Sequence, residues 1–319
     1  MLNREDDKLD TIEVKDLEVS YSGGKKSISN CSFSISSSEI FGLLGFNGAG
    51  KSTIIKVLSG VIKNFSGEVK ITGENIKINP EKSHSSIAYV PQFHSMFDDF
   101  TVKENILFFC KMEGVDYGEI EKTTNALLEE FQLKRFENIK AGMLSGGYRQ
   151  LLNIAISMIL DKPIVIFDEP TAGLDLWAKR RVIDYIKNLK HKGKTVILTT
   201  HDLQDAEQLC DNVIIISDGI VMASSSMRNL IQNLGGDYLI NVSLEKQINI
   251  KNLKLEFSKL VSSTQDQVVV STTSKNIAFA IKELMSSIED AGLSITDFKV
   301  KEPTLSDVFS NIAFKVQGK

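Results

Sequence analysis

EIFGLLGFNGAGKST, residues 39–53, decides the fold. Residues 39–45 are a compact apolar run that predicts a buried strand, and residues 52–62 carry apolar side chains at helical spacing. Between these segments, GFNGAGKST at 45–53 fits the pattern G-x-x-x-x-G-K-[ST]. Its glycines permit positive φ, so backbone N–H groups can close around phosphate oxygens where the helix begins. This order of strand, loop and helix favours a phosphate-binding loop over a plain tight turn.

Side chains at the end of this loop have the chemistry that a nucleotide phosphate needs. We expect Lys51 to reach the β and γ phosphates, the Ser52 hydroxyl to ligate Mg²⁺ and Thr53 to add a hydroxyl contact. The preceding loop residues would surround the phosphates: Asn47, Gly48, Ala49 and Gly50. The loop therefore predicts a nucleoside triphosphate bound with Mg²⁺.

Polar residues at the ends of other apolar runs extend this site. IVIFDE at 164–169 predicts a buried strand with Asp168 at its carboxyl end, where open α/β sheets bind ligands. Asp168 is expected to hold Mg²⁺, and Glu169 to polarise the water that attacks the γ-phosphate; a solvated acidic pair is the alternative. His201 ends the apolar run 195–201 and could hydrogen-bond the γ-phosphate, and Gln92 ends the run 86–92 and could bridge Mg²⁺ and the next segment.

The pattern of apolar residues divides the rest of the chain into segments. Apolar runs alternate with helical patterns up to about residue 235, which predicts an α/β domain with a parallel sheet covered on both faces. Residues 93–160 read as a helical insert, and strand patterns around one amphipathic helix make 236–319 a small α+β domain. We therefore predict a flexible tail at 1–10, a main domain at 11–235 and an accessory domain at 236–319.

Composition limits the classes of function. The net charge of −4 and pI near 5.7 argue against a sequence-independent nucleic-acid binder, so no nucleic-acid partner is expected. Three widely spaced cysteines make a disulfide framework or zinc site an unfavourable interpretation. No apolar run approaches the ~20 residues that cross a bilayer, and the acidic start lacks a signal-peptide core. We expect a soluble, cytoplasmic chain whose membrane role would come through a partner.

A second glycine-rich loop, LSGGYRQ at 144–150, lies about a hundred residues after the first one. With it, the segment 11–235 resembles the ATP-binding subunits of ABC transporters. In family terms the chain carries the Walker A loop at 45–53, the Q-loop at Gln92, the signature at 144–150, the Walker B strand at 164–169, the D-loop at 172–175 and the switch histidine at His201. The resemblance implies a P-loop (RecA-like) core with an antiparallel β subdomain and a helical signature subdomain, followed here by the C-terminal α+β domain.

The resemblance also implies what the second loop binds. In this family two ATPase domains pack head to tail, and the signature of one chain binds the γ-phosphate held by the other. Ser145 and the amides of Gly146 and Gly147 suit such an anion, because they open a helix. Tyr21 would stack on adenine, and Asp175 would lie at the dimer seam. Trp177, the only tryptophan, is expected to pack rather than bind.

Partners and direction of transport follow only from the resemblance. Residues 97–109 resemble the corresponding stretch of single-domain export ATPases, and EPTLSDVFSNI at 302–312 resembles the ending of ATPases for drugs, antibiotics, lipids or sodium. The expected partners are a second ATPase subunit, most simply an identical one, and a polytopic permease at the inner face of the cell membrane. The alternative is a soluble ABC-type ATPase switch with no transport role.

Overall fold

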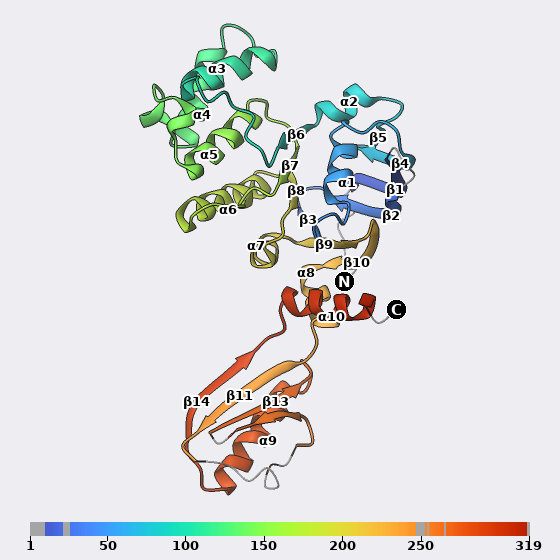
Figure 1. Cartoon of the computed structure of the whole chain (residues 1–319), viewed down its shortest axis with the longest axis vertical. Coiled ribbons are helices and arrows are strands. Elements are labelled where there is room, and N and C mark those ends of the chain that lie inside the picture. The colour runs from blue at the N-terminus through green and yellow to red at the C-terminus, as the bar shows by residue number, and fades with distance from the viewer. Residues whose placement is uncertain (1–9, 22–25, 247–252, 254, 265, 318–319) are drawn as a thin grey trace, which may run out of the picture. The chain divides into compact units, whose positions relative to one another are not determined.

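A computed structural model describes residues 10–21, 26–246, 253, 255–264 and 266–317 of the chain. The chain forms two compact units that divide between Ser226 and Met227 (Figure 1). The predicted tail at 1–10 lies almost wholly outside the described residues. Within the described part of the chain, no helix is long and apolar enough to cross a membrane.

The first unit is built on a six-stranded sheet in the order β10-β9-β3-β8-β7-β6. The strands are β3 (Ile40–Gly45), β6 (Ile87–Val90), β7 (Ile164–Asp168), β8 (Thr195–Thr199), β9 (Asn212–Ser217) and β10 (Ile220–Ser226). All pairs are parallel except β9 with β10. Every residue of β3, β7 and β8 is buried, as continuous apolar runs require when helices or sheets cover both faces. The predicted parallel sheet is confirmed.

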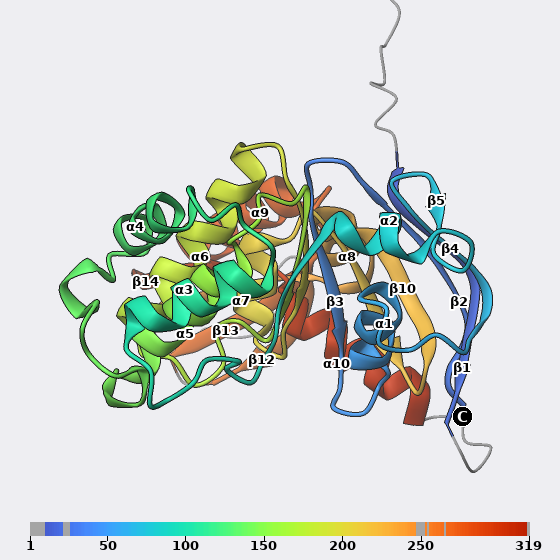
Figure 2. The same cartoon turned by 90° about the horizontal axis from the view of Figure 1, so that it is seen from above.

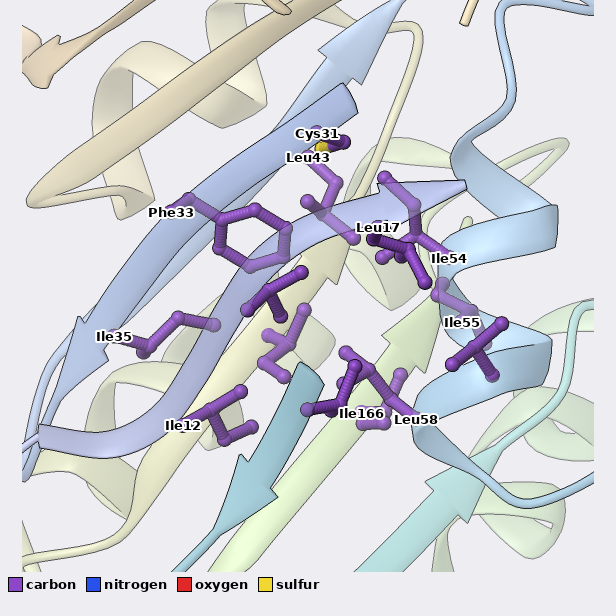
Figure 3. Close-up of a cluster of buried hydrophobic side chains, with 14 of the residues drawn as sticks. Ile12, Leu17, Cys31, Phe33, Ile35, Leu43, Ile54, Ile55, Leu58 and Ile166 are labelled. Carbon is purple, nitrogen blue, oxygen red and sulfur yellow. The ribbon is translucent and has the colours of Figure 1, made fainter. Parts of the chain in front are cut away.

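An antiparallel sheet packs on one face of this parallel sheet. It contains β1 (Asp10–Ser20), β2 (Lys26–Ser36), β4 (Ser66–Ile71) and β5 (Glu74–Asn75) in the order β2-β1-β4-β5. Side chains of β1, β2, β3 and β7 and of helix α1 (Lys51–Leu58) share one apolar core (Figure 3). Since side chains alternate along β7, Ile164 and Ile166 enter this core while Val165 and Phe167 face the other side. A short helix, α2 (Pro80–Ser85), follows β5.

Helices α3 (Val102–Met112), α4 (Ile120–Glu130) and α5 (Gly146–Ser157) form the helical subdomain, on the opposite side of the unit from the antiparallel sheet (Figure 2). A capping box starts α3, because the Thr101 side chain accepts from the Glu104 amide and the Glu104 side chain accepts from the Thr101 amide. Asn105 is fully buried and bonds the backbone of Phe97 in both directions. These contacts hold the segment after Gln92 against α3.

Two further helices connect the last strands of the first unit. Helix α6 (Leu176–His191) follows β7 and packs on β8, α5 and α7 (Leu203–Leu209). Asp175 caps α6 by accepting from the amide of Ala178. Helices α5 and α6 are therefore neighbours in the first unit.

The second unit is a four-stranded antiparallel sheet with three helices among the described residues. Its elements are α8 (Met227–Leu234), β11 (Tyr238–Leu244), β12 (Lys259–Ser263), β13 (Gln267–Thr272), α9 (Ile277–Asp290), β14 (Ile295–Lys301) and α10 (Leu305–Gln317). The strand order is β12-β13-β11-β14, and α9 covers one face through Ala280, Leu284 and Ile288. Helix α8 packs on α10, so the compact unit begins before the domain boundary predicted after residue 235.

Candidate functional site

The loop at 45–53 has three glycines at positive φ. At two of them, Gly45 and Gly50, close neighbours also leave no room for a side chain. φ is 153° at Gly45, 80° at Gly48 and 111° at Gly50. A Cβ on Gly45 would lie 2.2 Å from the carbonyl oxygen of Ile216, and one on Gly50 would lie 2.4 Å from Cδ1 of Ile28. A Cβ on Gly48 would meet no atom within 4 Å, so this residue borders open space. The loop is a cradle of backbone around a cavity, as phosphate binding requires.

Lys51 is the first residue of α1 and is only 7% exposed. Its Nζ donates to the carbonyl oxygens of Gly45, at 2.7 Å, and Phe46, at 3.2 Å. Burial lowers the pKa of Lys51, and the charges of Glu169 and Asp168 oppose that shift. The ammonium group thus lies across the loop, with two carboxylates facing it.

Asp168, at the end of β7, is 9% exposed and held on both carboxylate oxygens. The Thr199 hydroxyl donates to Oδ1 at 2.6 Å, and the Tyr89 hydroxyl donates to Oδ2 at 3.2 Å. Burial, together with the charge of Asp168 and this hydrogen bond, raises the pKa of Tyr89 to about 12. Tyr89 is therefore a neutral donor at physiological pH, and the carboxylate of Asp168 is fixed in orientation.

Glu169 has an unusual backbone for a non-glycine residue, with φ 53°. Its amide donates to the carbonyl oxygen of Thr199 at 3.1 Å and to the Thr199 hydroxyl at 3.0 Å. Its carboxylate contacts Nδ1 of His201. The Glu169 side chain is 11% exposed and that of His201 is 63% exposed. Strained backbone of this kind persists where neighbouring contacts determine it, and here Thr199 and His201 aim the carboxylate.

These residues line one cavity of about 380 Å³. The lining residues are Ser27, Asn47, Gly48, Ala49, Gly50, Lys51, Ser52, Thr53, Gln92, Asp168, Glu169 and His201. Tyr21 does not line it, but its hydroxyl lies 3.2 Å from Oγ1 of Thr53 and its side chain is half exposed. The tertiary fold therefore brings together the strand ends and the loop that the sequence predicted as one site.

The cavity has the donor set that MgATP needs. Backbone amides of the loop and the Lys51 ammonium supply positive groups for phosphate oxygens. The Ser52 hydroxyl, the Gln92 amide and the Asp168 carboxylate supply oxygens, the ligand type that Mg²⁺ prefers. The residues present thus fit both groups.

The other four predicted residues form a second group away from this cavity. Ser145 is the N-cap residue of α5, and both Ser145 and Gly146 are exposed. A Cβ on Gly147 would lie 2.5 Å from Cβ of Ala178 and 3.9 Å from Oδ2 of Asp175. The signature loop at 144–150 and the start of α6 are therefore in close contact, which places Asp175 beside the signature.

Residues that connect these parts were not predicted from the sequence. Gln150 is 4% exposed; its Nε2 donates to the carbonyl oxygen of Pro170 at 3.0 Å, and its Oε1 lies 3.2 Å from Nε2 of His94. Gln150 thus joins the signature helix to the segment after Glu169 and to the segment after Gln92. Its place at the end of LSGGYRQ was the available signal. For Thr199 and Tyr89 the only signal was a polar residue near the end of an apolar strand.

Comparison with known proteins identifies the family. A family model described as "ABC transporter" matches residues 28–172. The chain is 37% identical to the Nod factor export ATP-binding protein I of a Rhizobium species, over 69% of this chain and 72% of that protein. It is 29% identical to the linearmycin resistance ATP-binding protein LnrL of Bacillus subtilis, over 94% of this chain and 97% of that protein.

Solved structures agree with this assignment. One described as an ATP-binding subunit of an ABC transporter is 31% identical, with a TM-score of 0.63, and covers 70% of this chain and 93% of its own. Another, a dimeric ATP-binding cassette in a post-hydrolysis state bound to ADP and Pi, is 27% identical with a TM-score of 0.60 and covers 67% and 98%. The chain therefore belongs to the ABC transporter family, in which it is an ATP-binding subunit with ATPase activity.

Proposed function

We propose that this subunit powers export by closing head to tail with a second copy of itself around ATP. The separation of the two residue groups carries the proposal. Lys51, Asp168 and Glu169 line the cavity, whereas Ser145 and Gly146 are exposed at a helix N-terminus outside it. An exposed helix N-terminus can bind an anion that another chain presents. A second copy, placed head to tail, would present the γ-phosphate held by its own loop.

Within each site, we propose a role for each residue that the geometry and the family resemblance support. The loop amides and Lys51 hold the phosphates, and the Ser52, Gln92 and Asp168 oxygens would hold Mg²⁺, which would neutralise phosphate charge. Glu169, aimed by Thr199 and His201, takes the proton of the attacking water as the bond from the β–γ bridging oxygen to the γ-phosphorus breaks. The Ser145 hydroxyl and the Gly146 and Gly147 amides of the second copy stabilise the charge that develops on the γ-phosphate. Tyr21 would stack on adenine.

The transport direction and the partners are inferred from the relatives. Two relatives are named for Nod factor export and for linearmycin resistance, and the similarity to the second extends over almost the whole chain. We infer that this subunit works at the cytoplasmic face of the membrane with a separate polytopic permease. The helical subdomain, which follows Gln92, is where such a permease would receive ATP-driven movement.

The test is to trap the closed dimer. Glu169→Gln should bind ATP, hydrolyse it at least about 100-fold more slowly and run as a dimer with ATP but not with ADP, because only ATP has the γ-phosphate that joins the chains. Gel filtration with static light scattering and a phosphate-release assay measure both effects. Wild-type turnover in this variant would refute the role of Glu169.

Ser145→Arg is the matched variant in the second residue group. It should abolish hydrolysis and ATP-driven dimerisation while the monomer binds a fluorescent ATP analogue as the parent does. Loss of nucleotide binding by the monomer would contradict a site completed by a second chain. Copurification of the tagged chain with a polytopic membrane protein tests the export role; recovery from the soluble fraction alone would favour an ATPase switch.

A further inference from the structure

A row of aromatic and arginine side chains joins the signature loop to the start of α6. The Tyr148 ring lies 4.5 Å from the ring of Phe136 and 5.3 Å from that of Trp177, measured between centroids. The Arg135 guanidinium lies over Phe136 and Tyr148, and Arg181 lies over Trp177 at 4.8 Å. Arg135 also donates to the Tyr148 hydroxyl. We call these five residues the aromatic row.

The positions of the two central rings make the row more than surface packing. Tyr148 directly follows Gly147 of the signature, and Trp177 lies two residues after Asp175. Between the same two segments, Ala178 occupies the space that a Cβ of Gly147 would need. The close packing of Gly147 on Ala178 and the contact between the two rings therefore occur at the same junction. A shift of the signature loop relative to α6 would have to break both contacts.

Two members of the aromatic row are also exposed enough that burial alone does not explain their contacts. Trp177 is 47% exposed, and Arg135 is exposed. An aromatic side chain that only filled a core would be largely covered. Tilted ring pairs flanked by guanidinium groups instead fix the relative orientation of the segments that carry them.

We infer that Tyr148 and Trp177 are a positioning pair that makes the signature loop and the Asp175 segment move as one body when ATP closes the dimer. The inference rests on the proposed function, in which Ser145 faces the second copy, and on the expectation from the family resemblance that Asp175 lies at the dimer seam. Neither ring lines the cavity of the candidate ATP site. The pair acts through the signature loop, by delivering that loop and Asp175 to the second copy in a fixed relative position.

Removing either ring tests the pair. Tyr148→Leu and Trp177→Leu keep an apolar side chain but break the ring contact. We expect kcat for ATP hydrolysis to fall about tenfold with KM for ATP changed less than about twofold, and the ATP-driven dimer of the Glu169→Gln background to form in lower yield. Tyr148→Phe and Trp177→Phe keep the contact between rings and should restore most of the kcat.

A control ring pair involves another residue of α6. Phe131 and Tyr185 also connect the helical subdomain to α6, with ring centroids 4.8 Å apart. Tyr185 lies about 15 Å further along α6 than Asp175, at 1.5 Å per residue. Tyr185→Leu should lower the thermal stability while kcat and dimer yield remain close to the parent values, because its ring contact is remote from the signature.

Trp177 also reports the contact directly, since it is the only tryptophan in the chain. Tyr148→Leu should change the intrinsic fluorescence of the ATP-free chain, and Tyr185→Leu should leave it close to that of the parent. Unchanged fluorescence in Tyr148→Leu, parental kcat in both leucine variants, or an equal loss in Tyr185→Leu would overturn the inference. Failure of the Glu169→Gln parent itself to dimerise with ATP would instead refute the head-to-tail closure, and the positioning role with it.

Discussion

Replacing Gly147 by alanine probes how closely the signature loop must pack. The added Cβ would lie 2.5 Å from Cβ of Ala178. Methyl carbons pack at about 3.5–4.0 Å, so the two helix starts must separate by roughly 1.0–1.5 Å. Overpacking of this kind costs about 1–3 kcal/mol, and the higher helix propensity of alanine offsets less than about 1 kcal/mol of it.

The separation should affect hydrolysis more than stability. A net loss of about 1–2 kcal/mol corresponds to a Tm roughly 2–8 °C lower for a unit of this size. A displacement of about 1 Å in groups that stabilise a transition state can reduce the rate roughly 100-fold. We therefore expect Gly147→Ala to hydrolyse ATP about 100-fold more slowly and to bind ATP as a monomer with unchanged affinity.

A compensating variant makes the prediction specific. In Gly147→Ala with Ala178→Gly, the methyl group moves from α6 to α5 and the helix starts can return to their separation. Calorimetry and a phosphate-release assay on both single variants and the double variant measure the coupling between the two positions. If Gly147→Ala retains wild-type turnover, or if the double variant is no better than Gly147→Ala, close packing at this junction does not position the signature loop.

Two further predictions concern hydrogen bonds and charges. Thr199→Val removes the hydroxyl that donates to Asp168 and accepts from the Glu169 amide, so kcat should fall roughly 10- to 100-fold with KM for ATP nearly unchanged. The control Thr195→Val, at the other end of β8, should retain activity. Equal effects of the two variants in steady-state kinetics would contradict this. Lys179 contacts Asp202 at 2.5 Å and Asp205 at 2.8 Å. Burial, the largest single influence, raises the pKa of Asp202, but the hydrogen bond and charge of Lys179, together with the amides of Asp205 and Gln204, outweigh it and leave that pKa below its usual range. Because the folded-state pKa is the lower one, this stabilisation is present above about pH 4 and is lost as pH falls through the folded-state pKa. The Tm difference between wild type and Lys179→Met should therefore shrink from pH 7 to pH 3, and a difference independent of pH in thermal melts would refute the assignment.

Elements with a continuous local pattern could be predicted from the sequence. The apolar runs that became β3, β7, β8 and β9 have no polar interruption, and a buried strand is the simplest structure for them. Elements without such a pattern were missed. In β10 the apolar residues give way to three serines, and β12 is almost wholly exposed, so neither shows the alternation of a half-buried strand. Each forms because a neighbouring strand offers an open edge.

The candidate site divides in the same way. Lys51, Asp168, Glu169 and His201 stand in short motifs, each at the end of a strand or the start of a helix, so the chemistry of each could be inferred from neighbouring residues. Parallel strands bring their carboxyl ends to one edge of the sheet, which is why these motifs meet in one cavity.

The sequence by itself determined the phosphate loop, the buried strands with continuous apolar runs and the family, because these depend on residues close together in the chain. Only the tertiary structure decided which side chains support them. Three contacts join segments far apart in sequence: the hydrogen bond from Thr199 to Asp168, the packing of Ala178 on Gly147 and the ring contact of Trp177 with Tyr148. Such contacts depend on how the helices and strands pack on one another, to within about an ångström, and no local pattern of residue types contains that distance.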